Sequence, residues 1–197
     1  MEPSVDKERL MGFLMGTPHG TNWWNPWFGD SRDAEQRRDE LVGHLTARSA
    51  APVLMVGIAP GHKGARKSGI PFTDPETLGG DGREQTAMHV QSLLRDLNIR
   101  DKTVLWNVFP FHPHEVGDDE TNRDLTSAEE REFAPLVNHF QPRRRALVLA
   151  VGRPAARGMK SIGVEASYVC HPARNNHQKF RDDVTVQVER LRHEGLL

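Results

Sequence analysis

The sequence contains a single cysteine, Cys170, among 197 residues. One cysteine excludes a disulfide framework within the chain, and it excludes a four-cysteine zinc or iron–sulfur site. We therefore expect a protein that works in a reducing cytoplasm.

Long apolar runs are also missing. No stretch approaches the ~20 consecutive apolar residues that a membrane-spanning helix needs. Residues 1–10 are rich in charge and lack the apolar core of a signal peptide. These two features favour a cytoplasmic protein without a membrane anchor.

An excess of charge of one sign is absent as well. The 26 Lys and Arg residues nearly balance the 27 Asp and Glu residues, which leaves a formal net charge of −1. This balance excludes a protein that coats nucleic acid by charge alone, but it permits a local basic groove. The length suits one domain with a sizeable core. We expect a single domain over residues 1–197, acting as a monomer, in which an N-terminal helix and a Trp-rich segment (1–33) pack on the rest.

Short apolar runs alternate with segments of helical periodicity. The runs cover residues 53–57, 103–109 and 146–152, with a weaker fourth run at 166–170, and each has the unbroken character of a strand buried on both faces. The predicted helices are 34–48, 85–97, 127–140, 154–162 and 179–193. This alternation predicts an α/β fold with a parallel sheet covered on both faces. Ligands bind such sheets beyond the carboxyl ends of the strands.

Residues suited to chemistry follow three of the four runs. The first run leads into Gly57-Ile58-Ala59-Pro60-Gly61, a rigid turn at which a ligand can approach the backbone closely. The alternative for this segment is a plain strand-to-helix turn. The second run contains Asn107 and leads into His112-Pro113-His114-Glu115, and the fourth leads into His171-Pro172.

Five segments occur in a distinctive order: GIAPG, SGIPFTD, WNVFPFHPHE, VGRPAA and VCHPARNNHQKF. Together they resemble the uracil-DNA glycosylase superfamily, most strongly its bacterial branches without an iron–sulfur cluster, over roughly residues 24–184. The segments 25–27 and 121–123 also resemble those branches. The resemblance implies a three-layer αβα sandwich around a short four-stranded parallel sheet. It also implies DNA as the partner, with hydrolysis of the bond between a base and deoxyribose after the base is flipped out of the duplex. No cofactor and no metal are expected.

The resemblance assigns roles to individual residues. Cleavage of this bond places negative charge on the departing base, so the enzyme must donate hydrogen bonds to the base and place a water near the sugar. His171 corresponds to the histidine that faces the leaving pyrimidine, Asn107 to the asparagine that reads the base edge, and Phe72 to the ring that stacks on the base. The alternatives are a packing histidine, a loop-capping asparagine and an ordinary core phenylalanine. The further residues expected to contact substrate are Gly57, Ile58, Ala59, Pro60, Gly61, His62, His112, Arg174 and Asn175.

Two positions depart from the common pattern of the superfamily. Many members have Asp or Asn at the position of Ala59 to activate water, so another residue must hold the water here. The candidates are Asp74, His62 and Asn107, of which we favour Asp74 or Asn107. Strict uracil enzymes have a bulky aromatic residue at the position of Gly61, where it blocks the C5 side of the pyrimidine. Glycine leaves that space open to bases with larger C5 substituents.

Four other clusters are interpreted without a catalytic role. The segment 112–115 could offer zinc ligands, but its proline and short spacing make a closed site awkward, and contacts to DNA or to the base are preferred. In the loop 174–177, a polar wedge could fill the gap that the flipped base leaves. Trp23, Trp24 and Trp27 are expected mainly to pack in the core, and the basic run 143–145 is expected to be a solvated surface.

The predicted function is therefore a monofunctional DNA glycosylase that removes uracil or another modified pyrimidine in base excision repair. One alternative is a glycosylase that acts on hypermodified, C5-substituted pyrimidines of phage DNA in antiviral defence. The other is a catalytically weak DNA-binding relative, which Ala59 would allow.

Overall fold

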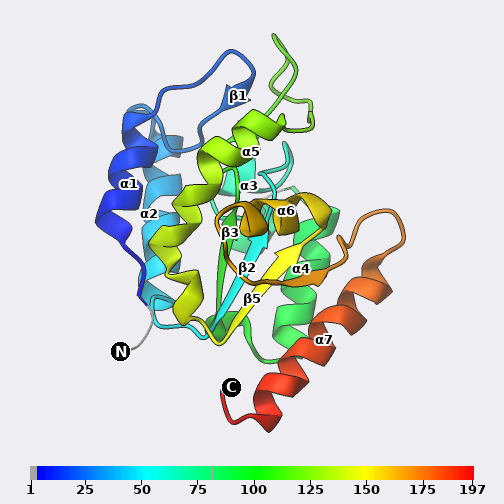
Figure 1. Cartoon of the computed structure of the whole chain (residues 1–197). Helices are drawn as coiled ribbons and strands as arrows, with labels where there is room; N and C mark the ends of the chain where they lie inside the picture. The colour runs from blue at the N-terminus through cyan, green and yellow to red at the C-terminus, as the bar shows by residue number, and fades with distance from the viewer. Residues whose placement is uncertain (1–3, 81) are drawn as a thin grey trace.

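The computed structural model describes residues 4–80 and 82–197, and its centre is a parallel sheet of four strands in the order β3-β2-β5-β6 (Figure 1). The predicted domain over 1–197 includes residues 1–3 and 81, which lie outside the described residues. The strands are β2 (Val53–Gly57), β3 (Thr103–Asn107), β5 (Leu147–Val151) and β6 (Ser167–Val169). Each lies within one of the four apolar runs, so the predicted parallel sheet is confirmed.

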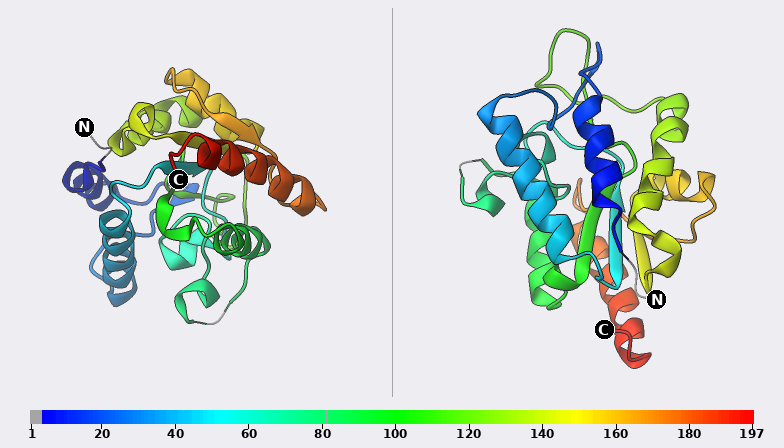
Figure 2. Two further views of the ribbon diagram at one scale, coloured as in Figure 1. Left: turned by 90° about the horizontal axis from the view of Figure 1, so that it is seen from below. Right: turned by 90° about the vertical axis from the view of Figure 1, so that its left-hand side faces the viewer.

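Helices cover both faces of the sheet, because alternate side chains of each buried strand point to opposite faces. Leu54 and Val56 join the core beneath α1, α2, α5 and α6, whereas Val53 and Met55 join a second core beneath α4 and α7. Figure 1 shows α5 and α6 in front of the sheet and α4 behind it, and Figure 2 shows α1 and α2 side by side. The helices are α1 (Lys7–Gly16), α2 (Arg32–Ala47), α4 (Gln85–Asp96), α5 (Ser127–Phe133), α6 (Arg153–Ser161) and α7 (His177–His193). The three-layer prediction is confirmed.

The predicted helix over 127–140 divides into two parts. It begins with a capping box, in which the Thr126 side chain accepts from the Glu129 backbone N–H and the Glu129 side chain accepts from the Thr126 backbone N–H. It continues as an α-helix to Phe133 and then as a 3-10 helix, η3 (Ala134–Phe140). Pro135 explains the change, because proline lacks an N–H and its ring clashes with the preceding helical turn.

A second, small sheet joins the N-terminal segment to the loop after β3. Its antiparallel strands β1 (Trp23–Trp24) and β4 (His112–Pro113) pair Trp24 with His112, a pairing that the sequence analysis did not predict. The Trp23 ring stacks on Phe111 with 4.5 Å between centroids. Trp27 is 1% exposed, which agrees with the expected core role, while Trp23 and Trp24 are half-buried.

The remaining elements are short: α3 (Ala65–Ser68), η1 (Glu76–Leu78), η2 (Arg100–Lys102) and η4 (Pro142–Arg144). The solvated surface expected over 143–145 requires one correction, because Arg145 is buried. Its guanidinium donates to the carbonyl oxygens of Phe140 and Ala51, so it ties η3 to the loop before β2. Within the described ranges, no helix is both long and apolar enough to traverse a bilayer.

Candidate active site

A cavity of about 210 Å³ lies beyond the carboxyl ends of β2 and β3, where the sequence motifs converge. Larger hollows occur elsewhere, such as one of about 400 Å³ beside His44 and Arg48, but they do not collect the motif residues. We therefore place the site in the smaller cavity. Its walls are formed by Ile58, Ala59, Pro60, Gly61, Ala65, Phe72, Thr73, Glu84, Thr86, Asn107, Asn122 and His171.

Because Gly57 has no side chain, the Asn107 and Phe72 side chains can approach each other closely in the cavity wall. Gly57 ends β2 and pairs in register with Asn107 at the end of β3. A Cβ atom at position 57 would lie 2.5 Å from Asn107 Oδ1 and 2.7 Å from Phe72 Cζ, closer than real Cβ contacts allow. Glycine thus lets the amide and the ring converge over its backbone.

Phe72 adopts a backbone conformation that L-residues rarely occupy, with φ at 57°. Such a left-handed residue costs on the order of 1–2 kcal/mol. Its carbonyl oxygen accepts a hydrogen bond from Gln91 Nε2 on α4 at 3.0 Å, which anchors the backbone on one side. The strained turn directs the ring into the cavity, where the sequence analysis expected it to stack on a base.

Asn107 is a buried residue whose amide faces the cavity. It is 3% exposed, and among residues 4–80 and 82–197 no group pairs with its amide. Buried polar groups are almost always paired, because an unpaired one costs about 1–3 kcal/mol. An amide offers two donors and an acceptor to a ligand that enters the cavity.

The His171 ring is prepared to donate a hydrogen bond. Its Nδ1 accepts from the Ala173 backbone N–H at 3.2 Å, so the neutral ring carries its proton on Nε2. The ring is open to solvent at the mouth of the cavity, yet the protein atoms packed around it, including Gly152, desolvate its charged form. This burial lowers the pKa of His171, and the negative charge of Glu84 opposes that shift.

Asp74 lies outside the cavity wall, although the sequence analysis favoured it as a water-positioning residue. Its Oδ1 accepts from the Thr77 backbone N–H at 2.8 Å and from the Thr77 hydroxyl at 2.5 Å. Its Oδ2 accepts from the Glu84 backbone N–H at 2.6 Å. Burial would raise the pKa of Asp74, but these hydrogen bonds outweigh it and lower the pKa. The geometry gives Asp74 a positioning role within the loop.

The open side of Gly61 faces a polar pair. A Cβ at Gly61 would meet only Asn122 Oδ1, at 3.9 Å, so this glycine faces nearly open space. Asn122 Oδ1 accepts from the His62 backbone N–H at 3.0 Å, and Asn122 Nδ2 donates to His62 Nδ1 at 2.8 Å. The ion pair between Arg66 and Asp119 holds the same loop, which contains Asn122, over the glycine-proline turn.

The His112 side chain is buried and cannot reach DNA or a base, so the direct contact predicted for it is wrong. It is 0% exposed, and its Nδ1 and Nε2 lie 2.9 Å and 3.0 Å from the carbonyl oxygens of Pro60 and Asp119. Burial lowers the pKa of His112 against these hydrogen bonds. The ring supports the cavity wall from behind. Over the described residues, no three His, Cys, Asp or Glu side chains gather as metal ligands.

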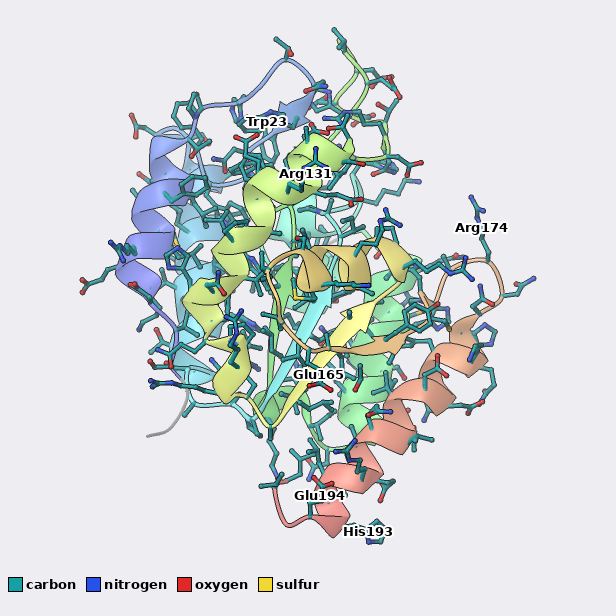
Figure 3. The ribbon with its side chains drawn as sticks, in the orientation of Figure 1. Trp23, Arg131, Glu165, Arg174, His193 and Glu194 are labelled. Carbon is teal, nitrogen blue, oxygen red and sulfur yellow. The ribbon has the colours of Figure 1, made fainter. Side chains whose placement is uncertain are left out.

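Arg174 and Asn175 lie outside the cavity on the exposed loop between β6 and α7. Both have left-handed backbones, with φ at 55° and 64°. The Arg174 side chain points away from the body of the protein (Figure 3). His171, which lies at the start of this segment, lines the cavity, whereas Arg174 and Asn175 at the tip of the loop are exposed and accessible to a large ligand.

The structure also adds wall residues that the sequence analysis did not assign to the site. These are Ala65, Thr73, Glu84, Thr86 and Asn122. Glu84 directly precedes the predicted helix 85–97, and Asn122 belongs to a segment that already resembled the superfamily. Their places in the chain were therefore notable, but neither place indicated that the side chain reaches the cavity.

Comparison with known proteins identifies the family and a solved structure of similar fold. The family model for the Uracil DNA glycosylase superfamily matches residues 45–192. The chain is also similar in structure to wild-type SMUG2 from Pedobacter heparinus, with a TM-score of 0.71 and 15% sequence identity over 96% of this chain and 99% of that chain. No curated protein matches the sequence.

Proposed function

Because the chain belongs to the uracil DNA glycosylase superfamily and is thus a DNA glycosylase, we propose that it excises uracil or another modified pyrimidine from DNA in base excision repair. The base is flipped out of the duplex into the cavity of about 210 Å³. The bond between the base nitrogen and C1′ of deoxyribose is then hydrolysed in a monofunctional reaction. No lysine stands among the described residues of the cavity wall, which fits a mechanism without a covalent enzyme–sugar intermediate.

The buried, unpartnered amide of Asn107 carries this proposal. A pyrimidine with an imide or amide edge supplies the donor and acceptor that this side chain lacks. Phe72 lies beside the amide, because both close on the same glycine, and its ring supplies a flat apolar surface for the base.

His171 supplies the electrostatic part of the reaction. Negative charge grows on the base as the glycosidic bond breaks, and a hydrogen bond from Nε2–H stabilises it. The neutral ring suits this task, because its lowered pKa keeps the proton on one nitrogen and leaves Nδ1 occupied by Ala173. The loop therefore presents a donor in a fixed orientation.

The test measures base release in single-turnover reactions on duplex and single-stranded DNA with a panel of pyrimidines. His171→Ala is expected to slow release about a hundredfold or more, the usual cost of one lost transition-state hydrogen bond. Its DNA affinity, measured by fluorescence anisotropy, should change little. Full activity of His171→Ala would refute the role of this residue. DNA binding by the wild-type protein without release of any base would instead identify a catalytically weak DNA-binding relative.

A second candidate substrate is a pyrimidine with a C5 substituent, such as the hypermodified bases of phage DNA, and Gly61 favours it. The space beside this glycine is bordered by the amide of Asn122 rather than by an aromatic ring. Gly61→Tyr should suppress release of C5-substituted bases and spare uracil. Gly61→Ala is the matched control, because one methyl group meets only Asn122 Oδ1 at 3.9 Å. A folded Gly61→Tyr protein that releases C5-substituted bases at the wild-type rate would exclude gating at this position.

A further inference from the structure

Ala59 stands where many superfamily members have Asp or Asn in the first motif, yet the wall of the cavity contains a carboxylate, that of Glu84. Among the described residues of its wall, Glu84 is the only acidic residue. The same wall holds the unpartnered amide of Asn107, which independently marks the cavity as a ligand site. Glu84 comes from the start of α4, 25 positions along the chain from Ala59.

The Glu84 side chain is held in one place by three features. Its Oε1 accepts from the Thr86 backbone N–H at 3.0 Å and its Oε2 from the Ala87 backbone N–H at 2.7 Å. A Cβ at Gly64 would lie 3.3 Å from Glu84 Cγ and 3.5 Å from Oε2, so that glycine gives the side chain room. Asp74 fixes the Glu84 backbone from the other side through the 2.6 Å hydrogen bond to its N–H.

Each Glu84 oxygen retains acceptor capacity, because a carboxylate accepts about four hydrogen bonds and two are used. Glu84 and His171 both line the cavity, and the carboxylate is close enough to act electrostatically on the His171 ring.

We propose that Glu84 positions and deprotonates the attacking water, with Asp74 acting as the positioning residue behind it. This assignment rests on the proposed glycosylase function. The bond between C1′ and the base nitrogen breaks, and its electron pair leaves with the base. The water oxygen bonds to C1′, its proton passes to the Glu84 carboxylate and then to solvent, and the base anion takes up a proton from solvent. Before the water bonds, the carboxylate also offsets the positive charge that develops on the sugar.

The experiment separates this role from helix capping. Glu84→Ser keeps a good N-cap, since serine is among the preferred capping residues, and it removes the carboxylate. Glu84→Gln keeps the size of the side chain and serves if the serine variant is unstable. The matched control is Asp6→Ser at the N-cap of α1, where Asp6 accepts from the Arg9 backbone N–H at 3.3 Å, outside the cavity wall. Urea unfolding checks all three variants.

Both Glu84 variants are expected to lower the single-turnover rate by roughly 10²–10⁴-fold, the usual effect of a general base. Asp6→Ser should retain the wild-type rate. The free energy of unfolding of Glu84→Ser should change little, because serine still caps α4, so a loss of rate in this variant reports the missing carboxylate rather than a weakened helix end. Folded Glu84 variants with rates within a few-fold of wild type would overturn the assignment and leave the proposed function standing. Failure of the wild-type protein to release any base would overturn the proposed function, and the assignment with it.

Discussion

Gly57→Ala tests the geometry of the cavity with the smallest possible change. The added methyl would lie 2.5 Å from Asn107 Oδ1 and 2.7 Å from Phe72 Cζ. Neither neighbour can yield freely, because Asn107 is 3% exposed and Phe72 belongs to a strained turn whose carbonyl is bound by Gln91. Ordinary contact begins at about 3.4 Å, so the two walls must separate by up to about an ångström.

A displacement of this size has a large catalytic consequence. Misplacing a reacting group by about 1 Å can cost on the order of a hundredfold in rate. Overpacking of a buried site costs typically about 1–3 kcal/mol in the free energy of unfolding, which leaves an ordinary domain folded. We therefore expect Gly57→Ala to be a folded protein whose single-turnover base release is about a hundredfold slower than that of wild type.

Gly61→Ala is the control for this prediction. It adds the same methyl group in the same turn, but it meets only Asn122 Oδ1 at 3.9 Å, and its rate on uracil should remain within a few-fold of wild type. Base release is followed on a labelled duplex, and stability is followed by urea unfolding. Equal rates for Gly57→Ala and Gly61→Ala would show that Asn107 and Phe72 do not form the walls that hold the base.

Three further predictions concern single side chains. Asn107→Leu replaces an unpaired buried amide with an apolar group of similar size, so the free energy of unfolding should stay within about 1 kcal/mol of wild type or rise, while base release is lost. Burial lowers the pKa of His44 from 6.5 to about 3. Below pH 6.5, His44 therefore binds a proton in the unfolded chain but stays neutral in the folded chain. The free energy of unfolding should therefore fall by roughly 2 kcal/mol because of this residue between about pH 6.5 and about pH 4.5, and urea unfolding of His44→Gln should show a correspondingly weaker pH dependence. Thr126→Ala removes the capping hydrogen bond to Glu129, and it should lower the free energy of unfolding by about 1 kcal/mol without changing base release.

The layers of the fold could be predicted from the amino-acid pattern alone. The runs at 53–57 and 103–109 are short, apolar and separated by a helical segment, and a parallel sheet with helices on both faces buries such strands completely. The same pattern predicted where chemistry collects, because the carboxyl ends of parallel strands share one edge. Asn107 and the turn 57–61 reach the cavity for this reason, since each directly follows or ends a strand.

Residues several positions beyond a strand end could not be assigned in this way. Asp74 and Glu84 are both acids in the connection between β2 and α4, and nothing in their spacing distinguishes them. The fold directs Asp74 toward backbone N–H groups of its own connection, whereas Glu84 caps α4 and lines the cavity. The difference arises because α4 begins at Gln85, so its N-terminus brings the capping side chain to the cavity wall.

The same physical reason explains the two corrections. The cluster at 112–115 suggested contacts to DNA or to the base, and the basic run at 143–145 suggested a solvated surface. His112 and Arg145 are both buried against carbonyl oxygens from distant segments: those of Pro60 and Asp119 lie within hydrogen-bond distance of the His112 ring nitrogens, and that of Ala51 accepts from Arg145. The sequence shows which polar side chains need hydrogen-bond partners. Only the tertiary structure brings those partners close, and this packing determines which side chains are buried and which face the ligand.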